Sequence, residues 1–165
     1  MMSRRRLWMI GLLLLVSSCT GTTNAYAGER GNFYGVTPVY CYDGDTCRFL
    51  IPWLPPPFTT IKVRLPSMNT PEIKGACPEE ITVAVEAKRT LEDAVLGADR
   101  VDLIDVGPAG IYGRHLAEIV VWKNRQSLRM SELMLGRGLA VRSEGKRINV
   151  WCPSPPMQET GEGTP

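Results

Sequence analysis

Polar and apolar residues alternate in three short stretches of the first half of the chain. Because successive side chains of a strand point to opposite faces, the alternation predicts strands over Gly31–Tyr42, Thr46–Ile51 and Thr60–Leu65. Asp43 and Gly44, between the first two stretches, form a hairpin-type turn signal. The proline-rich segment 52–57 predicts a surface loop, since proline offers no donor to a strand ladder.

The second half of the chain switches between helical and strand periods. Apolar residues at helical spacing predict a helix that begins at Pro78 and stops at Gly97. Two alternating stretches, Arg100–Val106 and Arg114–Trp122, predict strands, and Met130–Arg137 predicts a short helix ended by glycine. The order is three strands, a helix, two strands and a helix. It predicts an α+β fold, a five-stranded OB-type β-barrel with two to three packed helices.

The first 27 residues predict an export signal. A basic start precedes an apolar run over residues 7–16, which is short for a bilayer span, and Ala25–Ala27 resembles a cleavage site. The segment Val16–Cys19 resembles a lipobox, whose cleavage would leave a lipid anchor on Cys19. We expect an exported protein, periplasmic or secreted, with lipid attachment to the cell envelope as the alternative.

The predicted domain spans residues 31–152, and residues 153–165, rich in Pro, Gly, Ser and Thr, predict a disordered tail. Residues 1–27 contain three arginines and no acidic residue, so the rest of the chain carries 16 basic and 17 acidic side chains. Bulk charge therefore gives no argument for nucleic acid. The segment 123–147 has a local excess of basic residues, which suits either a phosphate backbone or an ordinary soluble surface.

Four cysteines fall in the predicted domain: Cys41, Cys47, Cys77 and Cys152. An even number in an exported protein predicts two disulfides, and the lack of a Cys-x-x-Cys spacing argues against a zinc site. Three connectivities exist. We favour Cys41–Cys47, which would staple two nearby strands, and Cys77–Cys152, which would tie the C-terminal end beside the acidic loop.

Several kinds of catalytic chemistry are excluded by the composition. The chain has one histidine, His115, so phosphodiester cleavage by two histidines is impossible. A Ser-His-Asp triad would need this histidine, whose place in a predicted strand is more typical of a surface residue. There is no Walker-type glycine loop, and paired cysteines leave no thiolate nucleophile. Carboxylates, arginines and oxygen ligands remain.

Oxygen-bearing side chains gather at two turns. The sequence DGDT at 43–46 places two acids at a tight turn, although such a sequence alone is more often only a hairpin. The sequence NTPE at 69–72 adds an amide oxygen, a backbone carbonyl and a further acid. Hard oxygens of this kind suit calcium or magnesium. The second turn also supplies Glu72, a carboxylate that could activate water.

Two arginines stand at the ends of predicted strands. Arg64 ends one strand and Arg114 begins another. Two guanidinium groups can clamp a phosphate and neutralise the charge that builds in its transition state. Together with a metal and Glu72, they predict phosphodiester hydrolysis without histidine.

Five motifs follow one another along the predicted domain: YDGDT at 42–46, VRL at 63–65, NTPE at 69–72, YGRHLA at 112–117 and GLA at 138–140. In this order they resemble the staphylococcal nuclease-like (thermonuclease) family. The resemblance runs from about Gly35 to Val141, nearly all of the predicted domain. It implies the family's OB-type barrel and calcium-dependent cleavage of DNA and RNA phosphodiesters with little sequence preference.

The resemblance also implies roles for individual residues. Asp45 would be the carboxylate ligand of calcium, and Thr70 would offer its backbone carbonyl to the metal. Glu72 would act on, or orient, the attacking water. Arg64 and Arg114 would hold the phosphate and stabilise the transition state.

Tyr112 would lie against the nucleotide's phosphate, and Asp43 would be a secondary acid. Two departures from the family pattern stand out. The family motif normally begins with an aspartate that binds the metal, and here it begins with Asn69, whose amide oxygen can coordinate but carries no charge. Calcium affinity should therefore fall. Gly110 and Ile111 replace an acid and a lysine that commonly precede the Tyr-Gly-Arg motif, so one phosphate contact is missing.

These observations predict an exported, calcium-dependent endonuclease that acts as a monomer on DNA and/or RNA, without a stable protein partner. One alternative is a catalytically weakened OB-fold module that only binds nucleic acid, which Asn69 and the basic segment 123–147 would suit. A third is an envelope-attached structural or interaction protein that has kept only the fold.

Overall fold

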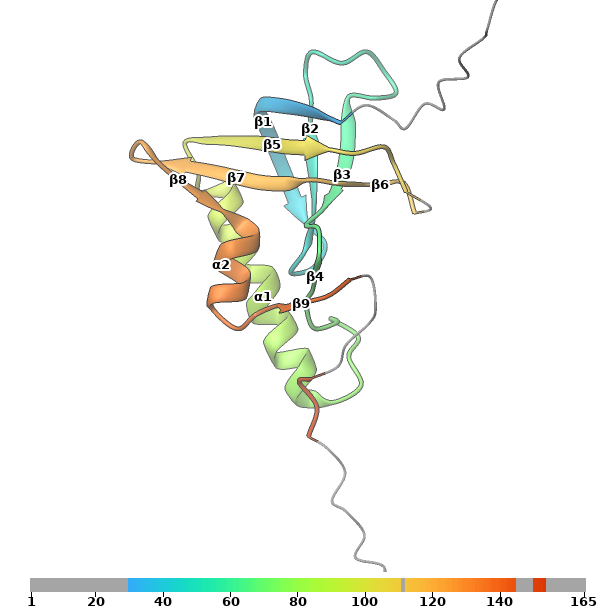
Figure 1. Cartoon of the computed structure of the whole chain (residues 1–165), viewed down its shortest axis with the longest axis vertical. Coiled ribbons are helices and arrows are strands. Elements are labelled where there is room, and N and C mark those ends of the chain that lie inside the picture. Colours follow the sequence, from blue (N-terminus) through green and yellow to red (C-terminus); the bar gives the residue numbers. More distant parts are fainter. Residues whose placement is uncertain (1–29, 111, 145–149, 154–165) are drawn as a thin grey trace, which may run out of the picture.

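The computed structural model describes residues 30–110, 112–144 and 150–153. These residues form an α+β structure with a mixed seven-stranded sheet, a two-stranded sheet and two helices (Figure 1). The expected export signal and Cys19 lie outside the described residues, as does the expected tail beyond residue 153.

The large sheet has the spatial order β6-β3-β2-β1-β5-β7-β8. Its strands are β1 (Gly31–Cys41), β2 (Thr46–Leu50), β3 (Thr60–Arg64), β5 (Arg100–Val106), β6 (Arg114–Leu116), β7 (Glu118–Lys123) and β8 (Gln126–Arg129). The small sheet pairs β4 (Met68–Asn69) with β9 (Val141–Arg142). The pairing of β3 with β6 is parallel, and the other pairings are antiparallel.

Strand β1 joins the two halves of the large sheet. Its first part pairs with β5, up to Val36 opposite Val101, and its second part pairs with β2 from Thr37 onward. The change of partner follows Gly35, whose φ of 65° lies in the left-handed region that favours glycine. As a result, β5 and β7 run across the direction of β2 and β3 (Figure 1).

Nine strands are described where five were expected, and the hydrogen-bonded sheet does not close into a barrel. The stretch predicted as one strand, Arg114–Trp122, is two strands that meet at the buried Ala117. It divides because β6 pairs with β3 whereas β7 pairs with β5. Strand β8 was missed because all four of its residues are exposed and give no alternation.

Both predicted helices are present. Helix α1 (Pro78–Leu96) begins with Pro78 after the cap residue Cys77 and ends before Gly97, whose N–H bonds to the carbonyl of Asp93 at 3.0 Å. Helix α2 (Met130–Gly136) buries Met130 and Met134. In the described part of the chain, no helix is both long and apolar enough to span a membrane.

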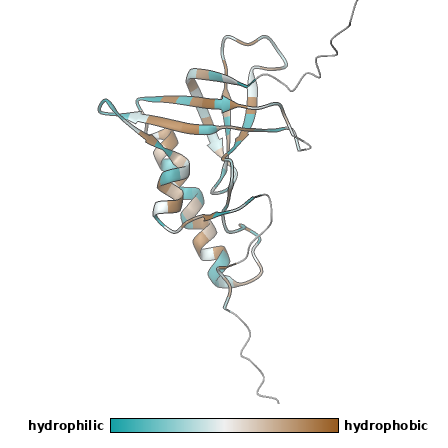
Figure 2. Cartoon of the chain, in the orientation of Figure 1, coloured by the Kyte–Doolittle hydropathy of each residue, from teal (hydrophilic) through white to brown (hydrophobic). Residues whose placement is uncertain are grey.

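The core lies between the sheet and the two helices. Its largest fully buried side chains from the sheet include Phe49, Val63, Leu103 and Ile119, and α1 contributes Leu91 and Val95. Apolar residues accordingly run along β5, β7 and the helices, whereas the β7–β8 turn is hydrophilic (Figure 2).

The cysteine pairing is confirmed. The sulfur atoms of Cys41 and Cys47 lie 1.96 Å apart, and those of Cys77 and Cys152 lie 2.08 Å apart. Cys41 and Cys47 are also register partners in β1 and β2, so their disulfide closes the turn that contains the two acids.

Candidate functional site

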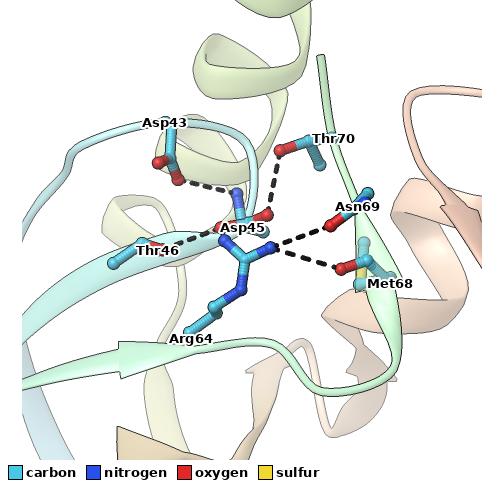
Figure 3. A network of polar contacts seen from close by, with 7 residues as sticks. All are labelled: Asp43, Asp45, Thr46, Arg64, Met68, Asn69 and Thr70. Atoms are coloured by element: carbon cyan, nitrogen blue, oxygen red, sulfur yellow. Dashed lines mark hydrogen bonds and ion pairs between the residues drawn. The ribbon is translucent and has the colours of Figure 1, made fainter. Parts of the chain in front are cut away.

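The guanidinium group of Arg64, at the end of β3, joins the two predicted oxygen-rich turns (Figure 3). Its Nη1 atom forms an ion pair with Oδ1 of Asp45. Its Nη2 atom donates to Oδ1 of Asn69 at 3.2 Å and to the Met68 carbonyl at 3.4 Å. Two turns that are separate in the sequence therefore meet at one cation.

Asp45 is a buried carboxylate, with only 2% of the residue exposed. Its oxygens accept hydrogen bonds from the hydroxyls of Thr46 at 2.7 Å and Thr70 at 3.1 Å. Its own N–H donates to Oδ1 of Asp43 at 3.1 Å. Burial raises the pKa of Asp45 to about 6; the Asp43 charge also raises it, and Arg64 opposes both.

Gly44 lets this turn lie close to α1. A Cβ atom at this position would come within 2.8 Å of the Ala87 Cβ and 3.0 Å of the Thr70 Cγ2. Any side chain would push the turn away from the helix. The glycine of the DGDT sequence is thus required by packing, in addition to the turn itself.

Asn69 is held by the small sheet. It lies in β4 opposite Val141 of β9, and two residues earlier the Ser67 carbonyl accepts the Ser143 N–H at 3.0 Å. The amide side chain therefore starts from a backbone that is held by pairing with β9. Sequence reasoning placed Asn69 in a turn and missed both short strands.

The segment that carries Glu72 is tied to the start of α1 by Glu80. The buried Glu80 carboxylate accepts the N–H of Glu72 at 3.2 Å and the N–H of Ala76 at 2.7 Å. Gly75 permits this approach, since a Cβ there would lie 2.7 Å from the Glu80 side chain. Glu80 was not among the residues predicted for the site. Its place as the third residue of the helix, typical of a capping box, was the available signal.

A groove of about 450 Å³ contains four of the predicted site residues. Its lining includes Arg64, Asn69, Glu72 and Arg114. Glu72 is exposed, and Asp45 is buried behind Arg64. The parallel pairing of β3 with β6 brings the two arginines to this edge of the sheet, because Lys62 and Arg64 pair with Arg114 and Leu116.

A second groove of about 360 Å³ begins on the other side of Arg114. It is lined by Tyr42, Asp43, Thr46, Lys62, Tyr112 and Arg114. The guanidinium of Arg114 lies 5.3 Å from the ring centre of Tyr112, a residue that is 75% exposed. Tyr112 and Asp43 thus lie beside the first groove.

The predicted calcium ligands are close to one another. Asp45 and Asn69 both bind Arg64, and the Thr70 hydroxyl binds Asp45. Carboxylate, amide and hydroxyl or carbonyl oxygens are the donors that calcium prefers, so the residues fit the ion chemically. Arg64 would share the same oxygens with the ion, and Asp45 supplies the one full charge among these three.

A different cluster also has ligand atoms close together. Among the described residues, one ligand atom each of Cys77, Glu80 and Cys152 lie within 4.8 Å of one another. The two sulfurs are bonded to each other, so they would become thiolate ligands only after reduction. This cluster was not among the predicted ligands, and its sulfur atoms do not suit calcium.

Other sequence predictions concern single residues. His115 is half-buried in β6, and its Nδ1 lies 2.8 Å from the Gly107 carbonyl oxygen. The basic residues of the segment 123–147 are spread over the β7–β8 hairpin, the residue after α2, and β9, and Lys146 and Arg147 fall outside the described residues.

No protein-family model matches this chain, and a search of curated proteins finds no significant match. The family resemblance rests on the five short motifs alone, and the roles of the site residues stay predictions.

Proposed function

We propose that the protein is an exported, calcium-dependent nuclease that hydrolyses phosphodiester bonds of DNA and/or RNA with low sequence specificity. The observation that carries the proposal is the groove lined by Arg64, Asn69, Glu72 and Arg114, with the buried Asp45 behind it. In the same proposal, the bent sheet is a variant of the OB-type barrel. The proposal of export is based on the sequence of residues 1–27 and is consistent with the two disulfides.

In this proposal the phosphate lies between the two arginines. Their guanidinium groups hold its oxygens and neutralise the negative charge that increases in the transition state. Glu72, exposed at the same groove, accepts the proton of the attacking water. The backbone contacts of Glu80 hold the Glu72 segment in place. Tyr112 packs beside the phosphate and limits the motion of Arg114.

Calcium would be held by Asp45, Asn69 and Thr70. When bound, it supplies positive charge that polarises a phosphoryl oxygen. The neutral Asn69 and the Arg64 ion pair both lower the net negative charge at these oxygens. We therefore expect weak calcium binding, completed by water.

Substitution of Glu72 tests the proposed chemistry. Glu72→Gln keeps the side-chain size and removes the proton acceptor, so kcat for DNA hydrolysis should fall about a hundredfold or more. Glu79→Gln is the matched control, because Glu79 is an exposed glutamate nearby that lines no part of the groove. Equal kcat values for the two variants would remove Glu72 from the mechanism.

A second candidate is a nucleic-acid-binding module without catalysis. It is favoured by Arg64, whose guanidinium holds both Asp45 and Asn69 where a metal would bind. Such a module would bind single strands in a salt-sensitive manner and leave them intact with or without calcium. Affinity that is unchanged between low and high salt would count against it.

A further inference from the structure

A row of one tyrosine and three cations crosses four strands of the sheet. Tyr40 of β1 pairs with Arg48 of β2, Arg48 with Lys62 of β3, and Lys62 with Arg114 of β6. Residues directly opposite one another on neighbouring strands share a face of the sheet. Val63 and Phe49, adjacent to these residues in sequence, are buried, so the row lies on the outer face. We call these four residues the transverse row.

Tyrosine rings accompany each cation of the transverse row. The Arg48 guanidinium lies 5.8 Å from the ring centre of Tyr40, and the Lys62 ammonium lies 5.4 Å from that of Tyr42. The two rings meet edge-on, 4.7 Å apart. Tyr112 takes the same place beside Arg114. The pattern of cation and ring is thus repeated on three strands.

The transverse row is positively charged and partly accessible, since Arg48, Lys62 and Arg114 are half-buried and the Nε atom of Arg48 is buried. Within the described ranges, Arg48, Lys62 and Arg114 form no ion pair with a carboxylate. Asp43 is the acid that lines the groove next to Lys62, and its Oδ1 accepts the Asp45 N–H. Tyr40 is 38% exposed. A ligand would therefore meet three positive charges together with the exposed rings of Tyr40 and Tyr112.

We propose that the transverse row binds a single-stranded segment of nucleic acid that continues from the groove of Glu72 across β3, β2 and β1. This inference rests on the proposed function, and it names the form of the substrate. Cations that follow a backbone and aromatic rings that stack on bases are the two elements of single-strand binding. Base faces are available to tyrosine only when the strand is unpaired.

The size of the row fits a short strand segment. Neighbouring strands of a sheet lie about 4.8 Å apart, so the three cations span roughly 10 Å. At roughly 3.4 Å per nucleotide, the spacing along one strand of a duplex, this length holds about three nucleotides. Arg114 lines both grooves, so the same arginine would contact the scissile phosphate and begin the row.

The first test is the salt dependence of binding. All proteins carry Glu72→Gln to prevent cleavage, and the probe is a fluorescently labelled oligothymidylate in a titration followed by anisotropy. Each phosphate contact to a single strand adds about 0.7 to the slope of log affinity against log salt. Arg48→Ala with Lys62→Ala should reduce the slope by about 1.4. Lys62→Gln alone, a milder change, should reduce it by about 0.7.

Matched controls distinguish an effect of the transverse row from an effect of the total positive charge of the protein. Lys88→Ala with Arg89→Ala removes two cations of α1, the helix that packs against the other face of the sheet, and should leave the slope unchanged. Arg48→Lys with Lys62→Arg keeps both charges and should retain the parent slope. Thermal unfolding shows that each variant is folded. Equal slopes for the row variant and the α1 control would overturn the proposal.

The second test separates stacking from charge. Tyr40→Leu should weaken binding of oligothymidylate about tenfold and leave binding of an abasic oligonucleotide of the same length unchanged, since only the former has bases to stack. If the loss is equal for both probes, or if heparin competes as well as oligothymidylate and Tyr40→Leu changes neither, the row is a general polyanion site and the proposal is overturned.

Cleavage is measured separately with Glu72 intact. If DNA is cleaved but the salt slope is the same in the row variants as in the parent, the proposal for the transverse row is wrong and the proposed nuclease activity is supported. If DNA is not cleaved but the slope falls in the row variants, the proposed nuclease activity is wrong and the transverse row is supported as a binding site.

Discussion

At the scale of single residues, Arg64 takes part in two parts of the proposed site. Its guanidinium neutralises the buried Asp45 and binds the amide oxygen of Asn69, and it also lines the groove where a phosphate would lie. A phosphate would bind the Arg64 guanidinium, and a calcium ion would bind the oxygens of Asp45 and Asn69 that Arg64 contacts. The charge at residue 69 therefore affects how strongly the oxygens attract calcium.

Asn69→Asp should tighten calcium binding. The change adds a carboxylate to oxygens that now include one full charge, so the calcium Kd should fall about tenfold, or about 1.4 kcal/mol. Isothermal titration calorimetry measures it, with Asn124→Asp at the exposed β7–β8 turn as the charge-matched control. An unchanged Kd in the first variant would place Asn69 away from the metal.

The pKa of Asp45 gives a prediction for the calcium-free protein. Burial raises this pKa from 3.8 to about 6, so the folded state binds the proton more tightly than the unfolded chain. The contribution of Asp45 to stability is therefore fully present below pH 3.8 and is lost as the pH rises to about 6. Asp43→Asn removes a charge that raises the pKa and should lower it. Carbon-13 NMR of the carboxyl group in chelator checks both, and a pKa near 3.8 in the parent protein would contradict the account.

At the scale of elements, the strands could be predicted better than their pairing. Alternation located β1, β2, β3 and β5 to within a residue or two, and proline and glycine marked both ends of α1. Alternation does not show which strands pair, so the parallel contact of β3 with β6 was not foreseen. Strands β4 and β9 have two residues each, too few for any period.

For the candidate site, the residues could be predicted from the sequence but their contacts could not. Motif residues such as Asp45 and Arg64 were found, but their direct contact depends on the β2–β3 register, which pairs Thr46 with Arg64. In β3, Lys62 lies two residues before Arg64 and therefore on the same face of the strand. Its alignment with Arg48 and Arg114 could not be known before the pairing was known.

Helix α1 should control the position of the Glu72 segment through Glu80. Glu80→Gln replaces one acceptor oxygen by a donor, so one of the two N–H bonds is lost at a cost of about 1–3 kcal/mol in the free energy of unfolding. Amide hydrogen exchange at Glu72 and Ala76 should become faster, with kcat reduced more than KM changes. Glu79→Gln, one residue earlier in α1, is the control. Unchanged exchange at both amides would show that Glu80 does not hold the segment.

At the scale of the whole molecule, the two disulfides lie at the two acid-bearing loops. Cys41–Cys47 closes the turn of Asp43 and Asp45, and Cys77 joins Cys152 to the start of α1 beside Glu80. The pairing of β3 with β6 brings Arg64 and Arg114 to the groove that Glu72 also lines. In the proposed exported enzyme, the two disulfides would hold both loops in an oxidising environment.

The most direct test of the proposed function is hydrolysis of nucleic acid by the purified, disulfide-intact chain. Single- and double-stranded DNA and RNA are incubated side by side over a calcium titration and with chelator. The account predicts cleavage that requires calcium, is abolished by chelator and is fastest on single strands. Nucleic acid that stays intact across the whole calcium range would contradict it.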